Sequence, residues 1–222
     1  MKRVFIVGAS RGIGLEFVRQ YRQAGAEVWA TARDDEGLAR IAALGAQAQR
    51  LDVTQVSAAT APGWLGEALR FDVAVFNAGV YGPRTTALVA PSQADFDRVM
   101  HTNVLGALQV LPWLVGHLAE DGVLGVISSR MGSMGLRTSP AGGLYRASKA
   151  ALNSVLKDAS LALAGRAVCV ALHPGWVRTD MGGAGADLDV RDSVSNLRRT
   201  LAGLTPAANG NFLDHDGTPL AW

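Results

Sequence analysis

Short apolar runs alternate with longer amphipathic segments along the chain, from residue 3 almost to the last residue. The runs lie at residues 3–7, 27–32, 47–51, 71–76, 122–128, 167–173 and 209–213. Such alternation is typical of βαβ units, in which a helix carries the chain from one strand to the next parallel strand. The sequence therefore predicts an α/β fold around a parallel sheet of seven strands.

Helices are expected between these strands. Apolar residues from 13 to 24 recur at helical spacing, and Gly25 follows where a left-handed helix cap is expected. Ser92 with Asp95 three residues later resembles a capping box, so a long helix should begin there. This helix carries Asn103 and is expected to kink near Pro112, because proline removes a backbone N–H.

Length and charge limit the class of protein. The 222 residues suffice for one α/β domain and leave little room for a second one. The formal net charge is +2 and the basic residues are spread along the chain, which argues against a nucleic-acid partner. The first apolar run is too short for a signal peptide, and no run has the length of a membrane span. A cytoplasmic protein without a membrane partner is expected.

Cysteine and histidine usage predicts neither a disulfide nor a metal site. Cys169 is the sole cysteine and lies inside an apolar run, so it should pack as a small hydrophobic residue. The histidines fall on different expected elements without ligand spacing. They are His101, His117, His173 and His215.

A glycine-rich turn, Gly-x-x-x-Gly-x-Gly, follows the first strand and opens the first helix. A pyrophosphate can lie against free N–H groups at a helix N-terminus, where missing side chains permit close approach. The alternative is a glycine turn that only reverses the chain. The residues of this turn that are expected to bind such a ligand are Gly8, Ser10, Arg11, Gly12, Ile13 and Gly14.

Further motifs follow this turn in a fixed order. They are Asn77-Ala78-Gly79 after the fourth strand, Asn103, Tyr145 with Lys149, and Pro174-Gly175 before Thr179. Over nearly its whole length the chain resembles the short-chain dehydrogenase/reductase family, and its ending, from Asn211 to Leu220, resembles the C-factor-like group. The resemblance implies a doubly wound Rossmann domain spanning residues 1–222, with strand order 3-2-1-4-5-6-7.

Two positions depart from the family pattern. Val7 stands where the family usually has threonine, and Phe76 stands where it usually has a second asparagine. Both changes remove polar groups that brace the first and fourth strands. We expect a repacked scaffold that still binds the cofactor.

The end of the second strand indicates which cofactor is bound. An acidic residue there would repel a 2′-phosphate, whereas arginine attracts it. The chain has Ala32 at this position, then Arg33, and Arg11 in the glycine turn can add a second positive charge. Together the two arginines favour NADP(H) over NAD(H), although either alone could be a surface charge. By resemblance, Asp52 and Val53 lie against the adenine; the residues alone indicate a loop or a helix cap.

Tyr145 and Lys149 are four residues apart on an expected helix, so their side chains share one face. A free tyrosine, with a pKa of about 10, is a poor base at neutral pH, and a nearby ammonium lowers that pKa. In reduction Tyr145 would donate a proton to the carbonyl oxygen. The resemblance implies that Lys149 also holds the nicotinamide ribose.

The remaining catalytic groups are a serine and an asparagine. Ser129, after the fifth strand, is expected to donate to the substrate oxygen, with Ser133 as the competitor and Ser128 facing away. The resemblance implies that Asn103 holds a helix kink and a water that relays protons to the lysine. It also places Pro174, Gly175, Val177 and Thr179 near the nicotinamide. The glycine-rich stretch 182–185 is either a substrate lid or an ordinary surface loop.

These expectations predict an NADP(H)-dependent oxidoreductase that interconverts a carbonyl and an alcohol by hydride transfer. The alternative is a signalling or sensor protein of the C-factor type that binds NADP(H) without physiological turnover. The partner is a small carbonyl or alcohol. A homodimer or homotetramer, paired through the helices that carry Asn103 and Tyr145, is compatible with their apolar content.

Overall fold

A parallel sheet forms the centre of the molecule in the computed structural model, which describes residues 1–55 and 62–222. Its strands are β1 (Arg3–Val7), β2 (Glu27–Ala32), β3 (Gln47–Arg50), β4 (Phe71–Phe76), β5 (Leu118–Ile127), β6 (Val168–His173) and β7 (Phe212–Asp214). Among the described residues these strands form one seven-stranded sheet in the order β3-β2-β1-β4-β5-β6-β7. The predicted α/β fold class and strand order are confirmed.

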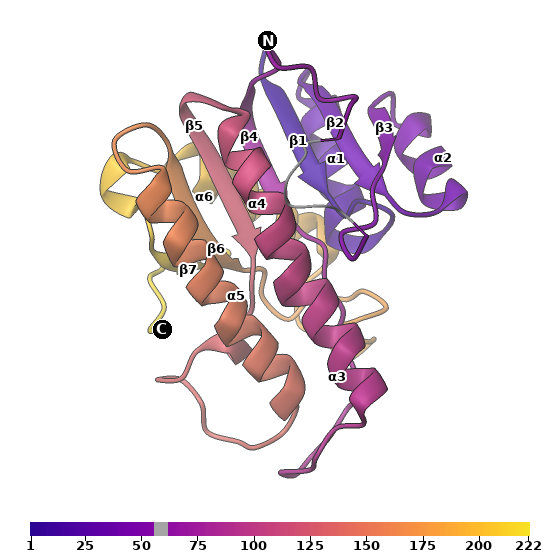
Figure 1. Ribbon diagram of the computed structural model, residues 1–222, viewed down its shortest axis with the longest axis vertical. Helices are drawn as coiled ribbons and strands as arrows, with labels where there is room; N and C mark the ends of the chain where they lie inside the picture. The colour runs from indigo at the N-terminus through magenta and orange to yellow at the C-terminus, as the bar shows by residue number, and fades with distance from the viewer. Residues whose placement is uncertain (56–61) are drawn as a thin grey trace.

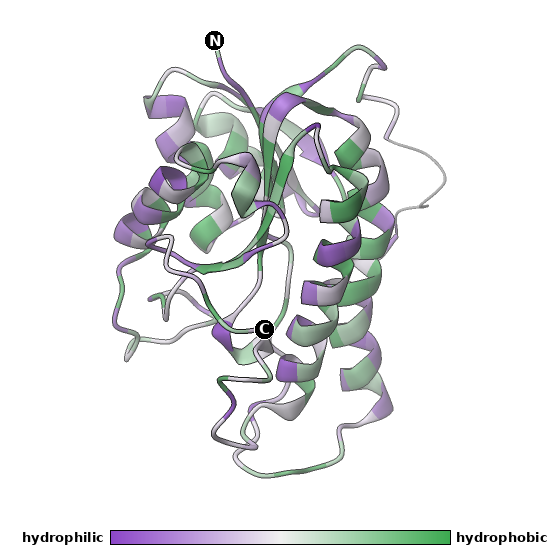
Figure 2. Cartoon of the chain, turned by 90° about the vertical axis from the view of Figure 1, so that its left-hand side faces the viewer, coloured by the Kyte–Doolittle hydropathy of each residue, from purple (hydrophilic) through white to green (hydrophobic). Residues whose placement is uncertain are grey.

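Helices cover both faces of the sheet (Figure 1). The helices are α1 (Gly12–Gln23), α2 (Asp35–Ala43), α3 (Gln93–Met100), α4 (Gly106–Gly116), α5 (Gly143–Ala162) and α6 (Val190–Ala202), with short 3₁₀ turns at Arg130–Gly132 and Pro206–Ala208. Side chains on the strands alternate between two cores. Phe5 packs with α4 and α5, whereas Ile6 packs with α1, α2 and α6. Figure 2 shows the resulting apolar centre between helices with polar outer faces.

Three strands have the predicted bounds and the others differ by a few residues. The bounds of β5 differ most from the prediction, because this strand begins at Leu118 rather than at residue 122. Leu118 is buried and pairs with Phe71, and a register shift follows before Val73. Asp121, with a φ of 59°, lies in this irregular stretch. The polar residues there hide the early strand start from a hydrophobicity pattern.

The long helix predicted after Ser92 contains a π-helical turn that the sequence did not indicate. The cap is confirmed, since the Ser92 hydroxyl accepts a hydrogen bond from the Asp95 N–H at 3.1 Å. The π-helical turn is at His101–Leu105, and Pro112 lies inside the regular helix α4. The expected kink near Pro112 stays a prediction. The wide turn coincides with the buried Asn103 side chain, which is held by distant backbone groups.

All strands run in the same direction, so their carboxyl ends meet at one edge of the sheet. In Figure 1 the segments leading into α3 and α5 extend beyond this edge. In open α/β sheets this edge is where ligands bind. In the described part of the chain, no helix has the length and apolar character required to cross a membrane.

Candidate active site

A cavity of about 370 Å³ lies at the carboxyl edge of the sheet. The predicted site residues that line it are Gly8, Ser10, Arg11, Gly12, Ile13, Arg33, Asp52, Val53, Asn77, Ala78, Gly79, Tyr145, Lys149, Pro174 and Thr179. They come from segments that are far apart in the sequence and follow β1, β2, β3, β4 and β6, together with helix α5. The structure therefore brings most of the predicted site together around one cavity.

The glycine turn is shaped by close contacts that leave no room for side chains. Gly8 has a φ of +82°, and a Cβ there would lie 2.8 Å from the Ala78 backbone. A Cβ on Gly14 would lie 2.3 Å from the Gly8 carbonyl oxygen, so Gly14 permits packing without lining the cavity. Helix α1 starts without a side-chain cap at Arg11 and without an acidic residue in its first turn. Its N-terminus is therefore suited to an anion.

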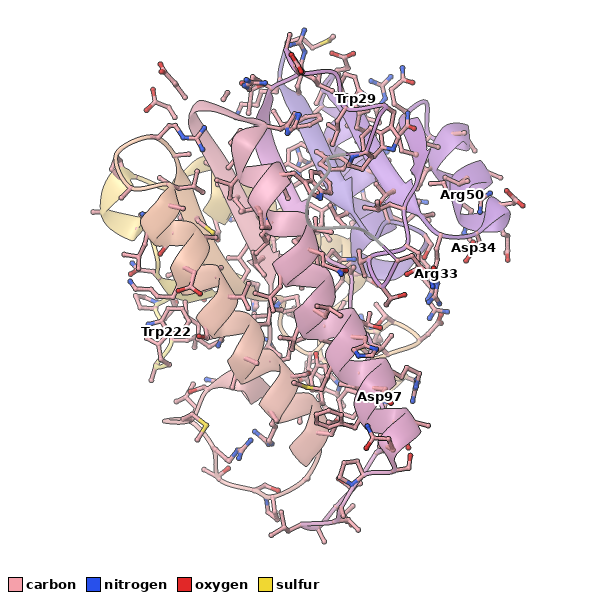
Figure 3. All side chains as sticks on the ribbon, viewed as in Figure 1. Trp29, Arg33, Asp34, Arg50, Asp97 and Trp222 are labelled. Carbon is pink, nitrogen blue, oxygen red and sulfur yellow. The ribbon has the colours of Figure 1, made fainter. Side chains whose placement is uncertain are left out.

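Arg33 lies at the end of the cavity near α2. Arg33 is exposed and lines the cavity, next to Ala32. Figure 3 shows Arg33 with Asp34 and Arg50 at this end of the sheet. The Asp34 carboxylate caps α2 by accepting the Gly37 N–H at 2.7 Å. The acidic group nearest to Arg33 in the sequence is thus engaged in a helix cap.

Arg11, the second arginine considered for the 2′-phosphate, forms an ion pair with Asp180, and both residues line the cavity. Its Nη1 lies 3.1 Å from a carboxylate oxygen of Asp180, and both side chains are more than two-thirds exposed. Ion pairs with this exposure contribute little to stability, because water screens them. Arg11 is therefore free to exchange the Asp180 carboxylate for another anion at small cost.

Asp52 caps a turn and also lines the cavity, and its contact with an adenine stays a prediction. Its Oδ1 accepts hydrogen bonds from the Thr54 N–H at 3.0 Å and from the Thr54 hydroxyl at 2.8 Å, which makes it a turn cap. It also lines the cavity. Val53 is buried, and a Cβ on Gly106 would lie 2.9 Å from it, so Val53 packs closely against α4.

Tyr145 and Lys149 project from α5 at the opposite end of the cavity, and both are buried. Lys149 Nζ donates to the Ile127 carbonyl at 2.9 Å and lies 5.8 Å from the centre of the Tyr145 ring. Burial lowers the pKa of Lys149 to about 8. Burial also raises the pKa of Tyr145 above its usual value, while a hydrogen bond from Ser129 opposes the rise. The expected lowering of the Tyr145 pKa by Lys149 is therefore outweighed by burial, which raises that pKa.

The three candidate serines have different surroundings. The Ser129 hydroxyl contacts Tyr145 and accepts the Met131 N–H at 3.1 Å. Ser133 is engaged elsewhere, because its hydroxyl donates to the Trp222 carbonyl at 3.2 Å. The Ser128 hydroxyl donates to the Asn153 side chain in the interior, although Ser128 also lines the cavity. The contact with Tyr145 favours Ser129 as the serine that works with it, although Ser129 is not among the residues that line the cavity.

Asn103 connects the π-turn with the rest of the site. Its amide accepts the Val80 N–H and donates to the Val80 carbonyl, both at 2.8 Å, and donates to the Ser148 hydroxyl at 2.9 Å. A Cβ on Gly79 would lie 3.4 Å from both Asn103 Oδ1 and Lys149 Nζ. Asn103 is fully buried and does not line the cavity. It therefore fixes the segment after β4 next to Lys149.

The segment after β6 differs in part from the prediction. Pro174 and Thr179 line the cavity, but Gly175 and Val177 do not. Gly175 has a φ of +82° and packs against Leu188, and Val177 is buried and forms a backbone bridge with Leu188. These two residues shape the segment without facing the cavity.

Several residues that line the cavity were not predicted from the sequence. They are Ala32, Leu51, Thr54, Val80, Thr102, Ile127, Ser128, Arg178, Asp180, Met181 and Val190, of which Ala32 and Ser128 were considered for other reasons. Most are neighbours of predicted residues and carry no signal of their own.

The glycine-rich stretch 182–185 begins in a turn that folds back toward Trp176, because Trp176 Nε1 donates to the Gly182 carbonyl at 3.0 Å.

Comparison with known proteins identifies the family. The model of the short chain dehydrogenase family matches residues 2–187. The chain therefore belongs to the short-chain dehydrogenase/reductase family, and it is an oxidoreductase of that family.

Individual relatives agree with this assignment. C-signal of Myxococcus xanthus is 41% identical over 154 residues, covering 68% of this chain and 92% of that protein. A carbonyl reductase of Pseudomonas aeruginosa PAO1, solved in complex with NADP, is 36% identical with a TM-score of 0.87, and the match covers 100% of both chains. A putative short-chain dehydrogenase/reductase of Burkholderia multivorans with bound NADP is 32% identical with a TM-score of 0.88, covering 100% of this chain and 99% of that one. The predicted family and the resemblance to the C-factor-like group are confirmed.

Proposed function

We propose that the protein is an NADP(H)-dependent oxidoreductase that interconverts a small carbonyl compound and an alcohol, with residues 1–222 acting as one cofactor-binding domain. The observation that supports this proposal best is the cavity, which extends from the glycine turn at one end to Tyr145 and Lys149 at the other. A single elongated ligand can therefore contact both ends.

The cavity fits a dinucleotide phosphate on several grounds. The glycine turn leaves space that a Cβ would fill, and the uncapped start of α1 suits a pyrophosphate. Arg33 and Arg11 supply positive charge for a 2′-phosphate. The last residue of β2, where an acidic side chain would repel that phosphate, is Ala32. The NADP-bound carbonyl reductase neighbour supports the same choice. Bound NADP(H) would supply or accept the hydride.

Tyr145 is the proposed general acid and base. Burial raises its pKa, so in the direction of reduction it stays protonated and can donate its proton to the carbonyl oxygen. Ser129 donates a second hydrogen bond to that oxygen and stabilises the charge that develops on it. Lys149 carries a positive charge below pH of about 8, and it would hold the nicotinamide ribose as the family resemblance implies. Asn103 holds the backbone of Val80, which follows Gly79, the residue next to Lys149 Nζ.

The setting of this activity is also part of the proposal. We place the protein in the cytoplasm, as a homodimer or homotetramer paired through α4 and α5. Exposed leucines on these helices support the pairing, since Leu108 is 47% exposed and Leu161 is 65% exposed.

The second candidate function is NADP(H) binding without physiological turnover, as in a signalling or sensor protein. The identity of 41% to C-signal is the observation that favours it. The presence of Tyr145, Lys149 and Ser129 around one site favours retained chemistry instead.

The test is a panel of carbonyl compounds followed by NADPH absorbance, with Tyr145→Phe as the key variant. Loss of a general acid should reduce turnover by about 10²-fold or more. Tyr21→Phe is the matched control, because Tyr21 is a buried tyrosine that packs against Phe17 on the other face of the sheet. Equal turnover of the parent and Tyr145→Phe would refute the proposed chemistry. NADPH binding without turnover of any compound would favour the sensor.

A further inference from the structure

A second tyrosine covers the proposed general acid. The ring of Tyr81 stacks on the ring of Tyr145, with 4.4 Å between the ring centres and 22° between their planes. Tyr81 comes from the segment after β4, whereas Tyr145 lies on α5. The contact therefore joins two separate walls of the site.

The backbone around Tyr81 is fixed on both sides. The preceding residue, Val80, is held by the Asn103 amide through both its N–H and its carbonyl group. On the other side, the Thr85 carbonyl accepts the N–H of Gly142, the residue before α5, at 2.9 Å. These bonds determine where the Tyr81 ring can lie.

The space around Tyr81 is adapted to its ring. Gly142 has a φ of +68°, and a Cβ there would lie 2.9 Å from the Tyr81 hydroxyl and 2.8 Å from Met131 Cε. A side chain at position 142 would therefore collide with the ring. The Tyr81 hydroxyl itself makes only a weak contact, with Met131 Sδ at 3.8 Å. The ring, rather than the hydroxyl, is what the surroundings accommodate.

Arg84 extends the stack toward the segment after β6. Its guanidinium carbon lies 4.8 Å from the centre of the Tyr81 ring, and it covers the opposite face because Tyr145 already covers the first. Arg84 Nη2 also donates to the Met181 carbonyl at 2.5 Å. Met181 lines the cavity, so the stack connects that segment with Tyr145.

We propose that Tyr81 is a positioning residue, which holds the plane of the Tyr145 ring and shields it from water, and that Arg84 steadies Tyr81 from the other side. This inference rests on the proposed function of Tyr145 as the general acid. It goes beyond that function, because Tyr81 acts only through its contact with the Tyr145 ring and itself transfers no proton.

The shielding has a measurable consequence for the pH dependence. The groups that face Tyr145 are Lys149 from α5, Ser129 from the segment after β5, and Tyr81. Without the Tyr81 ring, water can solvate the phenolate of Tyr145, and the pKa of Tyr145 falls. Reduction requires protonated Tyr145, so the rate would begin to decline at a lower pH. Lys149 also titrates, with a pKa that burial lowers to about 8, but better hydration would raise that pKa and move its limb to higher pH. A shift of the limb to lower pH therefore reports on Tyr145.

The experiment compares Tyr81→Leu, Tyr81→Phe and Arg84→Gln with the parent full-length chain, using a carbonyl that the parent reduces with NADPH. Tyr81→Leu should lower kcat about tenfold and move the alkaline limb of the kcat profile to lower pH by about one unit. Tyr81→Phe keeps the ring and should retain kcat within about threefold, with the limb unmoved. Arg84→Gln should lower kcat by less than Tyr81→Leu does and should move the alkaline limb to lower pH by a smaller amount.

NADPH binding, followed by fluorescence, checks that each variant is folded, because Tyr81 does not line the cavity. A fold defect lowers the active fraction without moving the pH limb. The inference is overturned if Tyr81→Leu keeps the parent's kcat and pH limb while Tyr145→Phe is inactive. If Tyr81→Leu does not fold, an unchanged kcat and pH limb in Arg84→Gln overturns it. Full activity of Tyr145→Phe would instead refute the proposed function and this inference with it.

Discussion

Arg33→Asp should reverse much of the preference for NADPH over NADH. Arg33 is exposed at the end of the cavity, so its attraction for a 2′-phosphate is screened by water, and its loss costs about 1 kcal/mol. The new carboxylate repels the same phosphate and adds about 1 kcal/mol. The sum of about 2 kcal/mol corresponds to roughly a 30-fold change in the ratio of the two Kd values. NADH has no 2′-phosphate, so its Kd should hardly change.

Fluorescence titration of each reduced cofactor measures this ratio without any substrate. Arg70→Asp is the matched control, since Arg70 is exposed and precedes β4 at the opposite edge of the sheet, and the change in charge is the same. Raised salt should shrink the effect of Arg33→Asp, because ions screen exposed charges. A ratio that changes by less than about twofold, or equally in Arg70→Asp, would contradict the assignment of Arg33 to the 2′-phosphate.

Two further variants test the burial of Lys149 and the tightness of the glycine turn. The folded pKa of Lys149 is about 8, below its usual 10.5, so the folded state is penalised at pH below about 8 and the penalty fades as the pH rises toward 10.5. Lys149→Met should therefore abolish turnover while raising the free energy of unfolding at pH 7 by roughly 2 kcal/mol, after about 1 kcal/mol is deducted for the lost hydrogen bond to Ile127. Denaturant unfolding should show this gain shrinking at pH 10, and an equal gain at both pH values would count against it. Gly14→Ala places a methyl group 2.3 Å from the Gly8 carbonyl oxygen and should cost about 1–3 kcal/mol of stability and most NADPH binding. Gly66→Ala, which meets nothing within 4 Å, is its control, and unaltered NADPH binding in Gly14→Ala would show that the turn can relax.

Strand positions could be predicted from the sequence because the inner strands of a parallel sheet are buried on both faces. β1, β2 and β4 appear as apolar runs with clear ends, and their bounds agree with the prediction. The π-turn at His101–Leu105 has no such signal. It is accompanied by hydrogen bonds between Asn103 and Val80, which lie 23 residues apart, so no local pattern could reveal it.

In the candidate site too, residues of a local motif could be predicted, whereas residues that depend on contacts between distant segments could not. Tyr145 and Lys149 belong to a motif with fixed spacing, and the structure places both at the cavity. Val177 was expected there too, yet it forms a bridge to Leu188, eleven residues later, and is buried away from the cavity. Asp180 and Tyr81 gain their significance only from Arg11 and Tyr145, which approach them through the tertiary fold. Pairs of this kind require the packing of distant segments to be known.

The two departures from the family pattern show how the scaffold keeps its shape without the expected polar groups. Val7 and Phe76 are fully buried and belong to the same core as Phe5. The brace between β1 and β4 is supplied by the neighbouring Asn77, whose amide donates to the Gly8 carbonyl at 2.6 Å. The Gly8 N–H in turn donates to the Thr31 hydroxyl of β2 at 3.0 Å. The glycine turn is thus held by polar groups on β2 and just after β4, and the apolar residues at positions 7 and 76 enlarge the core beneath it.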